Sequence, residues 1–106
     1  MGARDRALVP SLGSPAEAMA LFTQAFTHGA AGVVDDYAAL AQPWGFRVED
    51  ITVPLAIFQG DADTMVPSRH SEALARRVPK ATLTVWPGEG RLATVNHGGE
   101  VLDALP

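Results

Sequence analysis

The sequence predicts a small α/β protein with parallel strands. Residues 53–58, VPLAIF, form an almost continuous apolar run that ends near Gly60. A short run of this kind is typical of a strand that is buried on both faces of a parallel sheet. Residues 81–86, ATLTVW, form a second segment rich in β-branched side chains, and a helical pattern separates the two. A right-handed crossover then places both strands parallel in one sheet.

The first fifty residues read as helical. Residues 1–13 show no hydrophobic periodicity, and we expect a loose, disordered lead-in there. Ser14-Pro15-Ala16-Glu17 is a favourable helix start, with serine as the cap, proline at the first helical position and glutamate three residues after the cap. Apolar residues then recur at helical spacing until His28-Gly29. A second helix is expected at about 31–41, and Pro43-Trp44-Gly45-Phe46 after it is expected to form a packed loop.

The remaining elements complete a β-α-β-α order. A turn is expected from Gly60 to Pro67, then a helix at about 68–78, a loop at 87–90 and a closing helix at 97–105. We therefore divide the chain into a helical segment, 1–50, and an α/β segment, 51–106. Two parallel strands alone do not make a stable sheet. Either helices cover the open edge, or another chain covers it, or the sequence is incomplete.

Composition excludes several functional classes. The chain has 106 residues, of which 47% are hydrophobic and 19% charged, a balance typical of a globular domain. The net charge is −4 and the basic residues are scattered, so no nucleic-acid or membrane partner is expected. Without cysteine there is no disulfide, thiolate metal site or cysteine nucleophile. No apolar run has the length of a signal peptide or a membrane span, and we expect a soluble, cytoplasmic protein.

The segment Gly60-Asp61-Ala62-Asp63-Thr64-Met65-Val66-Pro67 carries the strongest chemical signal. It follows the carboxyl end of a predicted strand, where open α/β sheets place their functional groups. Its two aspartates suit the orientation of a histidine or the binding of a metal. The alternative is a polar turn, in which Asp61 accepts hydrogen bonds from local amides and Asp63 caps the next helix. From the spacing alone, the polar turn is favoured.

These residues, with Ile51-Thr52-Val53-Pro54 before them, resemble the penultimate strand and acid loop of the α/β-hydrolases. Asp63 falls on the family's triad aspartate. The similarity continues through the following helix and strand to residues 87–90, and residues 30–50 resemble the family's cap-to-core segment. The resemblance implies the C-terminal β-α-β-α part of a hydrolase core, preceded by two cap-like helices. It also implies ester or amide hydrolysis of a small-molecule substrate by the full-length enzyme.

The chain departs from that family at the base. Where the family has glycine-histidine after the last strand, this sequence has Gly90-Arg91. Arginine stays protonated at any working pH, so it cannot take a proton from a nucleophile. We expect Arg91 to form an ion pair with Asp63 instead. His97, six residues further on, is a candidate substitute base, although a structural or solvent-facing role is favoured for it.

The nucleophile is also missing. In the family it lies in a G-x-S-x-G elbow, and none of the four serines has glycines at both flanking positions (Ser11, Ser14, Ser68 and Ser71). No cofactor is expected, because no phosphate-binding loop follows Gly88 and Gly90. No metal is expected either, since the histidines and aspartates lack zinc and EF-hand spacing. We assign no role to His28 or His70.

The aromatic residues have two interpretations. They suit a substrate pocket beneath a cap, but core packing is favoured because they fall on predicted inner helix and strand faces (Phe22, Phe26, Tyr37, Trp44, Phe46 and Trp86).

The sequence thus predicts a truncated and catalytically impaired α/β-hydrolase. Two alternatives remain open: a non-catalytic binding or interaction module that uses the exposed sheet edge or an apolar cleft, and a truncated reading frame with no function of its own. Self-association through the open sheet edge is the expected protein contact.

Overall fold

The computed structural model describes residues 1–106, which form two compact units. One unit comprises residues 1–9 and 48–106, and the other comprises residues 10–47. The predicted class, mixed α/β with parallel strands, is confirmed. In chain order the elements are α1 (Ala3–Leu8), η1 (Val9–Leu12), α2 (Pro15–Ala25), α3 (Ala31–Leu40), η2 (Val48–Asp50), β1 (Leu55–Gly60), α4 (Ser68–Arg77), β2 (Ala81–Trp86) and α5 (Thr94–Asp103).

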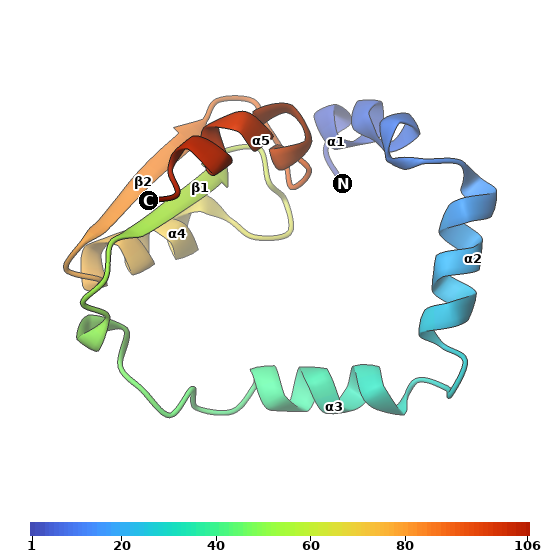
Figure 1. The fold of residues 1–106 in the computed structure, drawn as a ribbon, viewed down its shortest axis with the longest axis horizontal. Coiled ribbons are helices and arrows are strands. Elements are labelled where there is room, and N and C mark those ends of the chain that lie inside the picture. Colours follow the sequence, from blue (N-terminus) through green and yellow to red (C-terminus); the bar gives the residue numbers. More distant parts are fainter. The chain divides into compact units, whose positions relative to one another are not determined.

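The sheet consists of β1 and β2 alone. The strands run parallel, in a register that pairs Leu55 with Ala81 and Gly60 with Trp86. Helix α4 connects them and covers one face, and α5 lies over the other face (Figure 1). The outer edge of each strand is unpaired. The predicted burial of β1 on both faces is therefore only partly correct, since Ala56 is exposed and Ile57 is half-buried.

The buried apolar core of the sheet unit is small. It consists of Val48, Val78, Trp86 and Ala93. At its edge, Nε of Arg77 donates to Oε1 of Glu49 at 2.8 Å and fastens η2 to α4. This hydrogen bond raises the pKa of Arg77. Because few buried side chains support the sheet, individual polar contacts contribute much to holding its elements in place.

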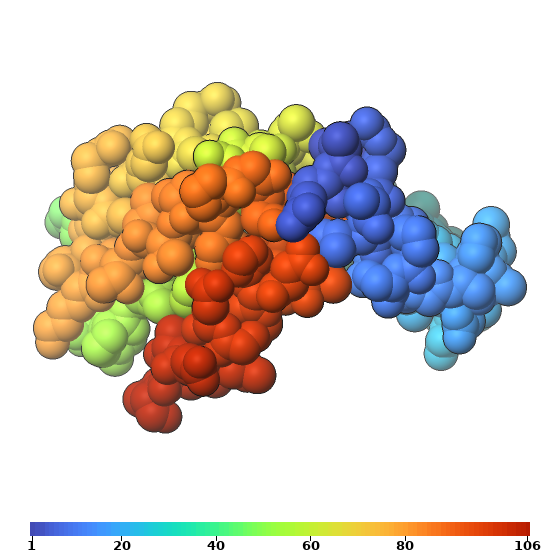
Figure 2. Space-filling model, turned by 90° about the horizontal axis from the view of Figure 1, so that it is seen from above, coloured from blue at the N-terminus to red at the C-terminus, as the bar shows by residue number.

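The N-terminal residues differ from the prediction of a disordered lead-in. Residues 3–8 form α1, and the side chain of Asp5 is fully buried, with 1% of its residue surface exposed. Figure 2 shows the dark-blue N-terminal segment lying against the orange residues that follow β2. The helix is held by polar contacts to that loop, which hydrophobic periodicity does not reveal. The boundary predicted at residue 50 also moves, because residues 1–9 and 48–50 belong with the sheet.

The unit of residues 10–47 contains the two predicted longer helices. Helix α2 begins with the expected capping box: Oγ of Ser14 accepts from the amide of Glu17 at 3.2 Å, and Oε2 of Glu17 accepts from the amide of Ser14 at 2.7 Å. These bonds lower the pKa of Glu17. Helix α3 also lies where it was predicted. No helix of the chain is both long and apolar enough to cross a membrane.

The favoured core role of the aromatic residues is wrong for five of the six. Each of these five side chains is exposed (Phe22, Phe26, Tyr37, Trp44 and Phe46). Helices α2 and α3 do not pack closely on one another, so their apolar faces have no partner within the unit. Only Trp86, on β2, is buried as predicted.

Candidate functional site

The carboxyl ends of β1 and β2 meet at one edge of the sheet, as expected for parallel neighbours. The amide of Ala62 donates to the carbonyl of Glu89 at 2.9 Å, so the two loops that follow the strands are joined directly. The carboxylate of Asp61 adds a second link, accepting from the amide of Gly88 at 2.6 Å. The polar-turn interpretation has Asp61 accepting from local amides, whereas this amide lies 27 residues further along the chain, so that part of the interpretation is wrong for Asp61. A Cβ atom at Gly60 would overlap the carbonyl of Glu89, so glycine permits this close approach.

The carboxylate of Asp63 organises its own loop. Its Oδ1 atom accepts from the amide of Met65 at 2.8 Å and from the amide of Val66 at 3.0 Å. Helix α4 begins after Pro67 without a side-chain cap, so the alternative in which Asp63 caps that helix is wrong. These two bonds fix the carboxylate and leave Oδ2 directed toward the loop after β2.

Arg91 is the residue that faces Asp63. Nη1 of Arg91 lies 3.9 Å from Oδ2 of Asp63, so the predicted ion pair is present at the outer limit of such contacts. The Asp63 side chain is 9% exposed, whereas that of Arg91 is 50% exposed. A guanidinium carries five N–H donors, and this pair engages it at one nitrogen only. The pair is therefore loose, and its cationic half faces solvent.

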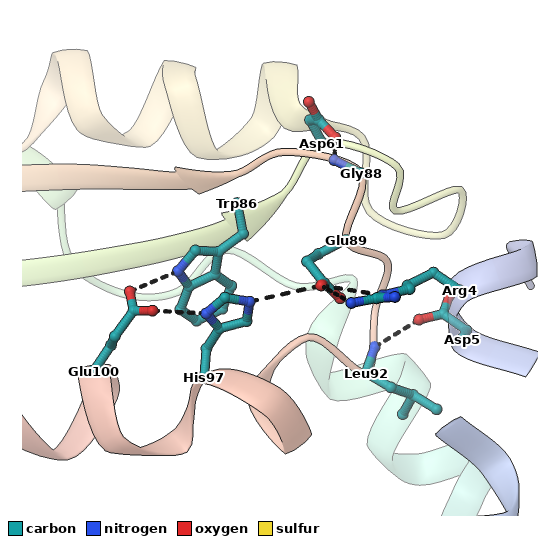
Figure 3. A network of polar contacts seen from close by, with 9 residues as sticks. All are labelled: Arg4, Asp5, Asp61, Trp86, Gly88, Glu89, Leu92, His97 and Glu100. Atoms are coloured by element: carbon teal, nitrogen blue, oxygen red, sulfur yellow. Dashed lines mark hydrogen bonds and ion pairs between the residues drawn. The ribbon is translucent and has the colours of Figure 1, made fainter. Parts of the chain in front are cut away.

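His97 belongs to a different set of contacts. Its ring stacks on the indole of Trp86, with centroids 4.4 Å apart, and Nδ1 lies 2.7 Å from Oε1 of Glu100 (Figure 3). Its Nε2 atom lies 3.7 Å from Oε1 of Glu89. Asp63 is not among its partners. These contacts support the structural interpretation of His97 over that of a substitute base.

Two glutamates frame the histidine. Oε2 of Glu100 accepts from Nε1 of Trp86 at 2.9 Å. The hydrogen bond with His97, followed by that from Trp86, lowers the pKa of Glu100. Glu89 is buried, and its pKa is lowered chiefly by the hydrogen bond from Arg4, with Nη2 of Arg4 3.0 Å from Oε1. The second carboxylate oxygen of Glu89, Oε2, is buried without a partner.

Helix α1 closes the opposite side of the same loop. Oδ1 of Asp5 accepts from the amide of Leu92 at 2.9 Å (Figure 3). This amide is the main cause of the lowered pKa of Asp5, and the amides of Arg91 and Gly2 lower it further. A Cβ atom at Gly90 would overlap the Asp5 carboxylate. No sequence pattern points to Asp5 or Arg4, because their partners lie more than 80 residues away.

A pocket of about 450 Å³ opens beside the Asp63–Arg91 pair. Gln59, at the end of β1, forms its polar floor: Nε2 donates to the carbonyls of Gly60 at 2.7 Å and Val66 at 3.1 Å. Oγ of Ser71 donates to Oε1 of the same side chain. Gln59 is not among the site residues predicted from the sequence. A polar residue at the end of an apolar strand could have indicated it. The pocket residues are Phe58, Gln59, Gly60, Asp63, Val66, Ser71, Trp86, Gly90, Arg91, Leu92, Ala93 and Thr94.

The remaining candidates add no catalytic group. His28 and His70 are exposed. The only serine in the pocket, Ser71, bonds to Gln59 and not to a histidine. No three histidine, aspartate or glutamate side chains gather into a set that could hold a metal ion. The site therefore offers a charge pair and a cavity, but no nucleophile beside a base.

No family model matches the chain, and no curated protein or solved structure matches it either.

Proposed function

We propose that this chain carries the acid corner of an α/β-hydrolase-type core in which Arg91 occupies the position of the base, and that the chain alone does not hydrolyse esters or amides. One observation carries the proposal. Asp63 and Arg91 follow the carboxyl ends of two adjacent parallel strands and lie 3.9 Å apart, the arrangement that the motif resemblance implies for acid and base. A small-molecule substrate and a cytoplasmic location remain predictions.

The chemistry of the pair is the reason for the proposed inactivity. General-base catalysis needs a group that accepts a proton near neutral pH, and it typically contributes about 10²–10⁴-fold in rate. The guanidinium of Arg91 cannot accept that proton. His97 is held by Glu100 and Trp86, so it does not replace the missing base beside Asp63.

Hydrolysis of p-nitrophenyl acetate by the purified chain tests this proposal. We expect the wild type, Asp63→Asn and the matched exposed control Asp35→Asn to release nitrophenol at the same rate. Turnover that Asp63→Asn abolishes and Asp35→Asn retains would refute the proposed inactivity. It would show that Asp63 works with a base other than Arg91.

A second candidate function is a protein-interaction module. It is favoured by the exposed apolar side chains of the 10–47 unit and by the two unpaired edges of the sheet. Sedimentation velocity over a range of chain concentrations tests it. Concentration-dependent association without turnover supports the module, and a monomer at all concentrations removes self-association from the candidates. The exposed side chains are Leu12, Met19, Leu21, Phe22, Phe26, Val33, Val34, Tyr37, Leu40, Trp44 and Phe46.

A further inference from the structure

The pocket beside Arg91 presents an unsatisfied cation. The guanidinium of Arg91 has one ion-pair partner, Oδ2 of Asp63 at 3.9 Å, and half of the Arg91 side chain is exposed. Most of its N–H donors are therefore available at the rim of a cavity of about 450 Å³. Cavities of about 300–1,000 Å³ are the usual size for small-molecule sites. The rim thus offers a charged hydrogen-bond donor to a molecule inside the pocket.

The carboxylates around Arg91 are already engaged. Asp63 uses Oδ1 for two loop amides and is almost fully covered. Asp5 is buried and accepts from the amide of Leu92, behind the loop. Glu89 is also buried and pairs with Arg4. The accessible charge at the pocket is therefore the guanidinium, which favours an anionic ligand over a cationic one.

The other lining residues indicate the chemical character of the rest of that ligand. Phe58, Val66 and Leu92 supply apolar lining, and Gln59 spends both of its amide hydrogens on backbone carbonyls. Thr94, the first residue of α5, adds an exposed polar side chain to the lining. The pocket lining therefore combines two exposed polar side chains, Arg91 and Thr94, with the apolar side chains of Phe58, Val66 and Leu92.

We infer that this pocket binds a small monocarboxylate with an apolar tail, with the carboxylate on Arg91 and the tail along Phe58 and Val66. The inference rests on the proposed function, because it uses the same corner of the sheet. It assigns Arg91 a binding role. The side chain that cannot act as a base binds a carboxylate, the anionic product of ester hydrolysis. A planar guanidinium binds a carboxylate through two parallel hydrogen bonds, which the long contact with Asp63 leaves free to form.

Titration of the ¹⁵N-labelled chain with octanoate tests the inference. We expect saturable shifts of the amides of Gly90, Leu92 and Thr94. The neutral isostere octanamide and the variant Arg91→Gln should each weaken binding by about tenfold or more, because a charge-assisted hydrogen bond is lost. The matched control, Arg76→Gln, removes an exposed arginine of α4 outside the pocket and should leave the affinity unchanged.

Two results would overturn the inference: no saturable shifts with octanoate, or equal affinity for octanoate and octanamide. Unchanged octanoate affinity in Arg91→Gln would also reject the assigned residue. These failures differ from failure of the proposed function, which concerns whether position 91 faces Asp63. In the variant Arg91→His, the pKa of the new imidazole can depend on Asp63 even when octanoate does not bind. That combination of results would support the proposed function and reject the carboxylate site.

Discussion

The imidazole of His97 stacks on the indole of Trp86 at an interplanar angle of 16°, and Glu100 bonds to both rings. The other aromatic partner of Trp86 is Phe58 on β1, with ring centroids 5.2 Å apart. This set joins β1, β2 and α5 in a unit with very few buried apolar side chains. We expect it to stabilise the position of α5 on the sheet.

Replacing His97 tests that role. Substitution His97→Ala should lower the free energy of unfolding by about 0.5–1.5 kcal/mol, the range found for an aromatic pair. Urea denaturation followed by circular dichroism provides the measurement. The control His70→Ala alters an exposed histidine of α4 and should change stability by less than about 0.5 kcal/mol. Equal effects of the two substitutions would show that the stacked ring does not hold α5.

Asp5 makes the stability of the fold depend on pH. Its pKa is lowered in the folded chain, mainly by the amide of Leu92, so its ionised form is the one that stabilises. This contribution is fully present above the ordinary aspartate pKa of about 3.9 and is lost as the pH falls through the lower folded value. Asp5→Asn should therefore destabilise the chain near pH 7, and the difference from wild type should shrink in acid. Thermal unfolding at several pH values measures it; a constant difference down to acid pH would contradict this origin.

Gly90 is a site where one methyl group should be costly. A Cβ atom there would overlap the Asp5 carboxylate, and overpacking of this kind typically costs about 1–3 kcal/mol. Gly99→Ala, in α5 with open space around it, should instead stabilise by up to about 1 kcal/mol. Chemical denaturation compares the two. The substitution Asp5→Ala should reduce the cost of Gly90→Ala, and undiminished cost in that background would place the clash elsewhere.

Local patterns were sufficient for most helices and strands. The capping box at Ser14, the apolar run of β1 and the β-branched residues of β2 gave elements that the structure contains, with the strands parallel. The motif resemblance also predicts that Asp63 and Arg91 lie together, and the structure places them 3.9 Å apart. Each of these features depends on residues that are close in the chain or on the right-handed crossover rule. Both kinds of information are present in a single sequence.

The errors have a common physical cause. Helix α1 is held by the contacts of Arg4 and Asp5 with residues far along the chain, so it has no periodic pattern to detect. The aromatic residues of α2 and α3 were assigned to a core because amphipathic spacing indicates an apolar face. Spacing does not supply the surface against which that face packs. Tertiary partners, not local propensity, decide both cases.

The most direct test of the account is the titration of an imidazole introduced by Arg91→His. Histidine signals are followed by NMR against pH, and the wild type, with His28, His70 and His97 only, identifies the new one. We predict that its pKa is higher with Asp63 present than in the double variant that also carries Asp63→Asn, because a facing carboxylate favours the protonated ring. The same pKa in both variants would mean that position 91 does not face Asp63, and the proposed acid corner would be contradicted.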